Sequence, residues 1–182
     1  MKTIKIIDNF LDKKDFRKID MYMVKGYEYA APHIQWYYIS LAGGVDEEYQ
    51  FIYPFPFSRN VREGNPEKEH HYFLKVINPI FEKLGIELSD LIKLRANLIP
   101  KNNKIIEHRL HTDIESEEVH KFITGIFYLN TNNGYTHFED GTKIESIANR
   151  LILFPTSMKH GGTTCTDSDT RVVLNMNYKE KE

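Results

Sequence analysis

The chain has 182 residues, of which 41% are hydrophobic and 27% are charged, a balance typical of a globular domain that excludes a disordered or fibrous chain. Its formal net charge of -2 gives no overall field that would attract a polyanion, so nucleic acid is not an expected partner. The single cysteine, Cys165, excludes an internal disulfide, a thiolate zinc site and an iron–sulfur cluster within one chain, so any metal must take nitrogen and oxygen ligands.

Residues 1–90 predict a strand and two helices around an aromatic-rich stretch. The β-branched run 3–7 predicts a strand, and residues 11–23 predict a helix with one apolar face. A second helix is expected over 66–84, where Pro79 should kink or divide it. No apolar run reaches the roughly 18 residues that a membrane span needs, and the N-terminus does not have the pattern of a signal peptide, which favours a cytoplasmic protein.

Aromatic side chains are concentrated in the segment from Tyr27 to Phe57, which glycines and prolines interrupt. This composition favours strands and a long loop over a helix. Two interpretations stay open. In one, the segment covers a site and Trp36 and Tyr53 line a substrate groove; in the other, the aromatic side chains pack a helical layer onto the rest of the fold.

From residue 91 onward, short segments of strand character alternate with turns. The segments are 91–99, 121–130, 135–139, 142–147, 150–155 and 171–178, with hairpin-type turn signals at 132–134 and 140–141. Several short strands with closely spaced turns favour a jelly roll preceded by helices, a mainly β fold of the α+β kind. We therefore expect one domain over 1–182, with the helices and aromatic-rich loop in 1–90 and a jelly-roll core in 91–180.

The segment HRLHTD, residues 108–113, contains two potential metal ligands at alternate positions. Alternate side chains of an extended chain share a face, so His111 and Asp113 can offer an imidazole and a carboxylate to one ion. His160 is a candidate third ligand because it precedes two glycines, which let the backbone pass close to a site. Two histidines and one carboxylate are the ligand set of non-haem iron(II) oxygenases, whereas a structural zinc site is normally closed by four protein ligands.

Arg171 begins the last predicted strand, where alternation places it on one face with Asn175. An arginine that faces a barrel interior is costly unless an anion meets it, and its planar fork matches a carboxylate with two parallel hydrogen bonds. Each feature also has an ordinary explanation: a hydrogen-bonded turn for the metal pair, a surface histidine, and an edge-strand arginine in water. Together and in this order, they form a much rarer pattern than any one of them.

From about Leu94 to Tyr178 the sequence resembles the 2-oxoglutarate- and iron(II)-dependent oxygenases, on the prolyl 4-hydroxylase-like side of that superfamily. The resemblance rests on HTD at 111–113, IFYLN at 126–130, GYTHF at 134–138, RLILFPTSMKHGG at 150–162, and Arg171. It implies a double-stranded β-helix, which is a cupin-like jelly-roll barrel, with supporting helices. It also implies a dioxygenase that hydroxylates its substrate and releases succinate and carbon dioxide.

By the same resemblance, His111, Asp113 and His160 would hold iron(II). Arg171 would bind the distal carboxylate of 2-oxoglutarate, and Tyr128 would be a further co-substrate contact or simply a core tyrosine. The implied cofactor and co-substrates are iron(II), 2-oxoglutarate and dioxygen, with ascorbate as a candidate addition. Animal and plant prolyl hydroxylases usually have lysine in place of the arginine, so the expected substrate is a peptide, prolyl or otherwise, or a small molecule.

Two other classes of function stay open on the sequence alone. A non-catalytic jelly-roll binding module would keep the fold without the chemistry, which the complete set of candidate ligands argues against. A cupin-like enzyme or hydrolase would use the same three ligands with zinc or manganese, but it gives Arg171 no task and lacks an evident general base. A nucleophilic pair of Ser157 and His160 would need a carboxylate partner that the sequence does not identify. The oligomeric state also stays open.

Overall fold

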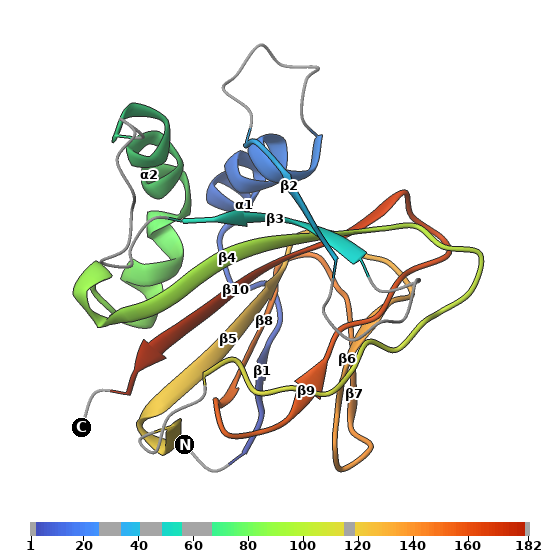
Figure 1. Ribbon diagram of the computed structural model, residues 1–182. Coiled ribbons are helices and arrows are strands. Elements are labelled where there is room, and N and C mark those ends of the chain that lie inside the picture. The colour runs from blue at the N-terminus through green and yellow to red at the C-terminus, as the bar shows by residue number, and fades with distance from the viewer. Residues whose placement is uncertain (1–2, 26–33, 41–48, 56–66, 115–118, 181–182) are drawn as a thin grey trace.

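The computed structural model describes residues 3–25, 34–40, 49–55, 67–114 and 119–180 (Figure 1). Tyr27, Tyr29 and Phe57 of the aromatic-rich segment lie outside these ranges. The helices and strands, in chain order, are β1 (Lys5–Ile7), α1 (Lys13–Asp20), β2 (Tyr37–Ser40), β3 (Tyr49–Pro54), α2 (Glu67–Leu84), β4 (Leu91–Pro100), β5 (Phe122–Tyr128), β6 (Tyr135–Phe138), β7 (Lys143–Glu145), β8 (Arg150–Pro155), β9 (His160–Gly161) and β10 (Thr170–Lys179).

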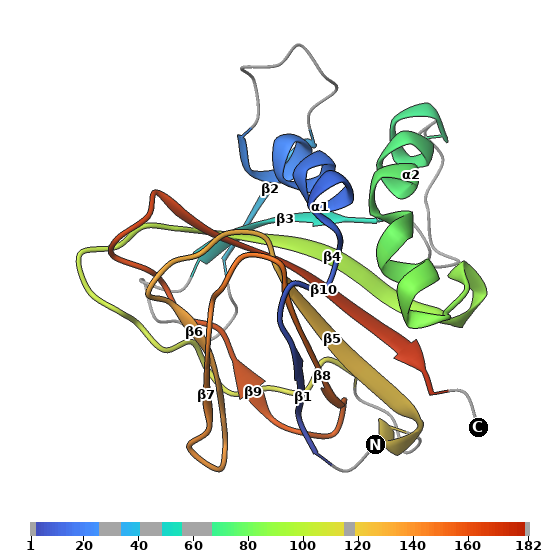
Figure 2. The same ribbon diagram turned by 180° about the vertical axis from the view of Figure 1, so that it is seen from behind.

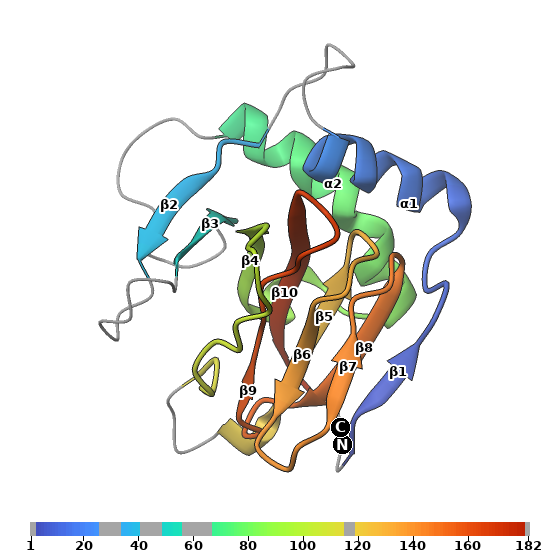
Figure 3. The same ribbon diagram turned by 90° about the vertical axis from the view of Figure 1, so that its right-hand side faces the viewer.

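The strands form two antiparallel sheets. Seven of them pair in the order β1-β8-β5-β10-β4-β3-β2, and three form a smaller sheet in the order β7-β6-β9. In Figure 3 the smaller sheet lies in front of one face of the large sheet, and α1 and α2 lie behind the other face. Two facing antiparallel sheets connected in this way make a jelly roll. The predicted fold class, a mainly β jelly-roll barrel with supporting helices, is confirmed.

The helix-covered face of the large sheet carries the main hydrophobic core. Side chains alternate along each strand, so Leu94 and Ala96 of β4 share this face with Leu174 and Met176 of β10. The register places Leu174 opposite Ala96 and Met176 opposite Leu94. All four are buried, at 2% exposure or less. The other face of the same strands is therefore left to line the barrel interior.

Asp12 caps the N-terminus of helix α1, and its side chain accepts a hydrogen bond of 2.9 Å from the amide of Asp15. The helix buries Ile19 in the main core. It continues into a π-helical turn, Met21–Lys25, which buries Met23. The predicted helix over 11–23 thus ends in a different helical form from the one expected.

Helix α2 runs without interruption from Glu67 to Leu84, so the expectation that Pro79 could divide the helix is wrong. Ile77, Ile80 and Phe81, on either side of the proline, are almost fully buried in the main core. This packing stabilises the helix even though a proline removes one backbone hydrogen bond. Figure 2 shows both helices on the same side of the large sheet. In the described part of the chain, no helix has the length and apolar character that crossing a membrane requires.

Candidate metal centre

An antiparallel backbone bridge brings His111 and His160 side by side. The amide of each residue donates to the carbonyl oxygen of the other, with both N–O distances at 3.0 Å. His160 belongs to β9, whereas His111 lies in the segment that connects β4 to β5. The two ring centroids are 4.9 Å apart. The barrel therefore brings together two histidines that are distant in sequence.

Asp113 completes a cluster with these two rings. Its Oδ1 lies 3.8 Å from Nε2 of His111, and its Oδ2 lies 3.6 Å from Nε2 of His160. One potential ligand atom from each of the three residues lies within 4.8 Å of the others. Over the described ranges, no other group of three His, Cys, Asp or Glu residues has this spacing.

Both histidine rings can present a nitrogen lone pair to the cluster. Nδ1 of His111 lies 3.2 Å from the carbonyl oxygen of Arg109, and Nδ1 of His160 lies 3.2 Å from that of Met158. A proton on Nδ1 can be donated to the carbonyl oxygen, which leaves the lone pair of Nε2 free for a metal. Burial lowers the pKa of His160, which favours the neutral ring that metal binding requires.

The side chain of Asp113 is fully buried and surrounded by donors. Nδ2 of Asn175 and Nδ2 of Asn177 lie 3.2 Å and 3.1 Å from its Oδ2, respectively. Nζ of Lys93 lies 3.4 Å from its Oδ1. Burial alone would raise the pKa of Asp113, but the charge of Lys93, joined by that of His160 whenever its ring is protonated, outweighs it. With the two asparagine hydrogen bonds, these charges hold this pKa well below its usual range, so the carboxylate is ionised and oriented.

This donor set fits iron(II). Two neutral imidazole nitrogens and one carboxylate oxygen leave coordination positions on such an ion free for further ligands. A closed structural zinc site would need a fourth protein ligand, which the described residues around the cluster do not supply. Ser157, the sequence alternative for a nucleophile, is exposed on the turn after β8, whereas Nε2 of His160 faces Asp113.

Arg171 is buried near the metal cluster, with 2% of its surface exposed. Its Nε donates to Oγ of Ser146 at 2.8 Å, and one terminal nitrogen donates to Oγ1 of Thr136 at 3.1 Å. None of these described partners is a carboxylate. Burial lowers the pKa of the guanidinium, but the usual pKa of arginine is so high that the group stays charged. A buried cation without a counter-ion is costly, and an anionic ligand would remove that cost.

Tyr128 and Gly134 shape the surroundings of Arg171. Tyr128 is fully buried, and its hydroxyl donates to Oγ1 of Thr136 at 2.8 Å. The guanidinium carbon of Arg171 lies 5.6 Å from the centre of the tyrosine ring. A Cβ at Gly134 would lie 2.8 Å from Cδ of Arg171, so a side chain at that position would displace the arginine. The arginine is thus held in one orientation by several neighbours.

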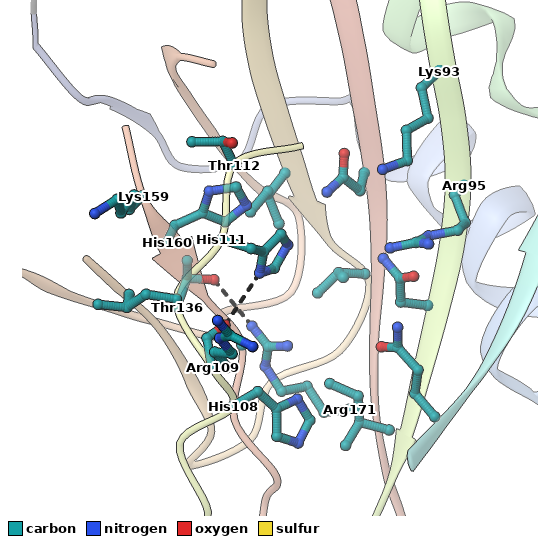
Figure 4. Close-up of a pocket in the computed structure, with 18 residues that line it drawn as sticks. Lys93, Arg95, His108, Arg109, His111, Thr112, Thr136, Lys159, His160 and Arg171 are labelled. Carbon is teal, nitrogen blue, oxygen red and sulfur yellow. Dashed lines mark hydrogen bonds between the residues drawn. The ribbon is translucent and has the colours of Figure 1, made fainter. Parts of the chain in front are cut away.

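A cavity of about 620 Å³ connects the metal cluster to Arg171, a volume in the range of small-molecule sites (Figure 4). Its wall includes both histidines, Arg171 and the polar face of β4. Lys93, Arg95 and Asn97 of that face were not predicted as site residues. The sequence does contain a pattern that could have identified them, because polar side chains stand at alternate positions in the segment LIKLRANLI.

The interpretation in which Trp36 and Tyr53 line the substrate groove is wrong for these two residues. Tyr53 lies opposite Ala96 on the helix-covered face and is 4% exposed. Trp36 packs against the same core. Alternation along β3 instead directs Gln50 into the cavity. Both aromatic residues follow the second interpretation, in which they pack the helical layer onto the barrel.

Known proteins resemble this chain in structure and not in sequence. No protein-family model matches the sequence, and no curated protein matches it either. One similar solved structure is an oxidoreductase of the 2OG-Fe(II) oxygenase family from Burkholderia pseudomallei. It is 10% identical, with a TM-score of 0.64 over 98% of this chain and 86% of that chain.

Two further structures show the range of proteins that share this fold. A prolyl hydroxylase from Trichoplax adhaerens, in complex with a hypoxia inducible factor peptide fragment, is 16% identical, with a TM-score of 0.58 over 97% of this chain and 83% of that chain. The alpha ketoglutarate dependent epimerase SnoN from nogalamycin biosynthesis is 11% identical, with a TM-score of 0.61 over 98% of this chain and 77% of that chain. At such identities the likeness establishes the fold: this chain has the double-stranded β-helix of these oxygenases.

Proposed function

We propose that this chain is a 2-oxoglutarate- and iron(II)-dependent oxygenase. The observation that carries the proposal is a buried arginine, with no acidic partner among the described residues, in the same cavity as a cluster of two histidines and one aspartate. A metal-binding cluster alone would suit several metalloenzymes. The fold, together with Arg171 as a second group that would bind an anion, favours an enzyme that holds a metal and a dicarboxylate together.

In this proposal His111, Asp113 and His160 hold the iron through Nε2, a carboxylate oxygen and Nε2, respectively. When bound, iron and 2-oxoglutarate supply the oxidation: one oxygen atom of dioxygen enters succinate as carbon dioxide leaves, and the other is inserted into a C–H bond of the substrate. The lysine and asparagine donors around Asp113 keep it ionised and fix its direction.

Arg171 binds the distal carboxylate of 2-oxoglutarate in this account. Its guanidinium is already desolvated and oriented by Ser146 and Thr136, so little order has to be gained on binding. In this account Tyr128 serves the co-substrate by positioning Arg171, because its hydroxyl donates to Oγ1 of Thr136 and its ring lies beside the guanidinium. The barrel walls exclude water from the Arg171 end of the co-substrate, because Arg171 is almost fully buried.

The substrate is a peptide or a small molecule. The structures with the same fold include a prolyl hydroxylase in complex with a peptide and an epimerase from nogalamycin biosynthesis, so the fold serves both classes. The reaction proposed here is hydroxylation, with release of succinate and carbon dioxide.

The test is succinate formation from 2-oxoglutarate by the purified protein, with iron(II) and ascorbate under air. Wild type should form succinate slowly without substrate, His111→Ala should form none, and Arg171→Gln should need a much higher 2-oxoglutarate concentration. Arg17→Gln, at an exposed position on α1, is the matched control and should behave as wild type. Absence of both succinate formation and 2-oxoglutarate binding in wild type would contradict the proposal and favour a binding module or another metalloenzyme.

A further inference from the structure

The cavity has a strongly basic wall beyond the groups that the proposed function uses. The described residues that line it include five basic side chains, Lys93, Arg95, Arg109, Lys159 and Arg171, and no Asp or Glu. The neighbouring carboxylate is that of Asp113, which the proposed function assigns to the metal. In Figure 4, Lys93 and Arg95 extend from β4 toward the space occupied by Arg171 and the histidines.

Among the described cations of this wall, Arg95 is distinguished by a buried nitrogen that has no hydrogen-bond partner. Lys159 pairs with Glu139 at 2.8 Å, and Lys93 lies 3.4 Å from Asp113. The side chain of Arg95 takes part in none of the described hydrogen bonds or ion pairs, and its Nε is buried without an acceptor. A buried donor is normally satisfied in a folded protein, so the unpaired Nε of Arg95 indicates that a ligand supplies the acceptor.

Asn175 places an unpartnered acceptor beside Arg95. The two residues are directly opposite each other in the pairing of β10 with β4. Nδ2 of Asn175 is directed at Asp113, which fixes the orientation of the amide and leaves Oδ1 buried without a donor. Oδ1 of Asn97, on the same wall, is also buried without a donor. The wall therefore offers one cationic fork and two acceptors.

The charges of the proposed complex cancel one another without compensating that of Arg95. A divalent metal with Asp113 and two neutral histidines carries one net positive charge, and Arg171 adds a second. The two carboxylates of 2-oxoglutarate cancel both. The charges of Arg95 and Lys93, both half-buried, then remain on the cavity wall, where an additional anion is favoured.

We propose that the Arg95 side chain binds a carboxylate of the primary substrate, and that this substrate is a small carboxylic acid with an N–H donor, such as a free amino acid. The planar guanidinium suits a carboxylate, and Oδ1 of Asn175 and Oδ1 of Asn97 suit an ammonium or amide N–H beside it. This inference rests on the proposed function, because it takes Arg171 and the metal as occupied by 2-oxoglutarate. An acidic side chain of a peptide offers the same carboxylate and forms the second arm of the test.

The experiment is calorimetric titration of the zinc(II)-loaded protein, in which the metal is redox-inert, with saturating 2-oxoglutarate. The probes are the free L-amino acids and, as ligands of matched shape, the same amino acids with a neutral carboxamide group in place of the carboxylate. Peptides that contain Asp or Glu, blocked at both ends, form the second arm. Arg95→Gln removes the charge, Arg95→Lys keeps it, and Arg17→Gln is the control for an exposed arginine.

At least one amino acid should bind about tenfold or more tightly than its carboxamide, and Arg95→Gln should abolish that preference. Arg95→Lys should retain part of it, and Arg17→Gln should retain all of it. Unchanged 2-oxoglutarate binding by Arg95→Gln shows that this variant is folded. Binding of blocked acidic peptides alone would overturn the small-molecule assignment. Equal binding of acids and carboxamides, or no binding of either, would overturn the inference.

Failure of the proposed function gives a different result. If wild type does not bind 2-oxoglutarate, the same titrations are made on the zinc(II) protein without it. A carboxylate preference that depends on Arg95 would then support this inference while the oxygenase proposal fails. Normal 2-oxoglutarate binding without an Arg95-dependent preference would overturn this inference and leave the oxygenase proposal standing.

Discussion

The two faces of β4 and β10 show how one pair of strands can serve both stability and chemistry. Toward the helices, Leu94 and Leu174 are apolar and fully packed in the main core. Toward the cavity, their sequence neighbours Arg95 and Asn175 are polar and keep buried atoms without partners. Each residue faces the side opposite its neighbour, so a change at one position should affect folding and a change at the next should affect ligand binding.

The largest effect is expected on the helix-covered face. Leu174→Ala removes a fully buried side chain between the sheet and the helices and should lower the free energy of unfolding by about 2–5 kcal/mol. Urea denaturation measures this change, and Leu174→Met should cost less than about 1.5 kcal/mol because it nearly conserves volume. A loss of metal affinity in folded Leu174→Ala protein would contradict the separation of the two faces.

The stability of the fold should depend on pH because of His108, a residue on the cavity side. Burial, with the charges of Arg171, His137 and His111, lowers the pKa of His108 from 6.5 to about 4. Between these values the unfolded chain binds a proton that the folded chain does not, so stability falls as pH falls from 6.5 toward 4, by about 3 kcal/mol in total. His108→Leu should flatten this part of the stability profile, measured by urea denaturation at several pH values. A profile as steep as that of wild type would show that another group is responsible.

A smaller effect is expected for the donors that hold the metal carboxylate. Nδ2 of Asn177 reaches Asp113 at 3.1 Å and Thr124 at 2.9 Å. Asn177→Ala should weaken metal affinity about 10- to 100-fold, because the carboxylate loses a group that orients it. Competition with a chelator measures the affinity. Asn103→Ala, in the exposed turn after β4, is the matched control, and equal effects of the two substitutions would argue against an orienting role.

The smallest effect is expected at Tyr128. Tyr128→Phe keeps the buried ring beside Arg171 and removes the hydroxyl that donates to Thr136. Loss of one buried hydrogen bond of this kind is worth about 0.5–1.5 kcal/mol, so the KM for 2-oxoglutarate should rise several-fold while metal affinity is unchanged. A change in metal affinity, with KM unaltered, would place the tyrosine in a different role.

The sequence predicts the fold well where periodicity is strong. The six strand segments after residue 90 correspond to strands, and alternation correctly groups Arg171 with Asn175 on one face. It does not predict β9, which has only two residues and no period of its own. The sequence also does not predict the π-helical turn at 21–25, because its side chains fit an α-helical pattern.

The sequence predicts the residue types of the site better than it predicts the contacts between them. The hydrogen bonds of Asn175 and Asn177 to Asp113 span 62 and 64 residues, and no local pattern encodes such contacts. The error at Tyr53 has a related cause. An aromatic residue on a strand can face either side, and only the pairing of Tyr53 with Ala96 decides which, since a shift of one residue exchanges the faces.

The most direct test of the central claim is anaerobic titration of 2-oxoglutarate into the iron(II)-loaded protein, compared with metal-free protein and with iron(II)-loaded Arg171→Gln. If the cluster and Arg171 hold the two ends of one co-substrate, one equivalent should bind tightly to loaded wild type, and affinity should fall steeply when either the metal or the arginine is removed. Equal affinity in all three samples, or no binding to any of them, would contradict the account.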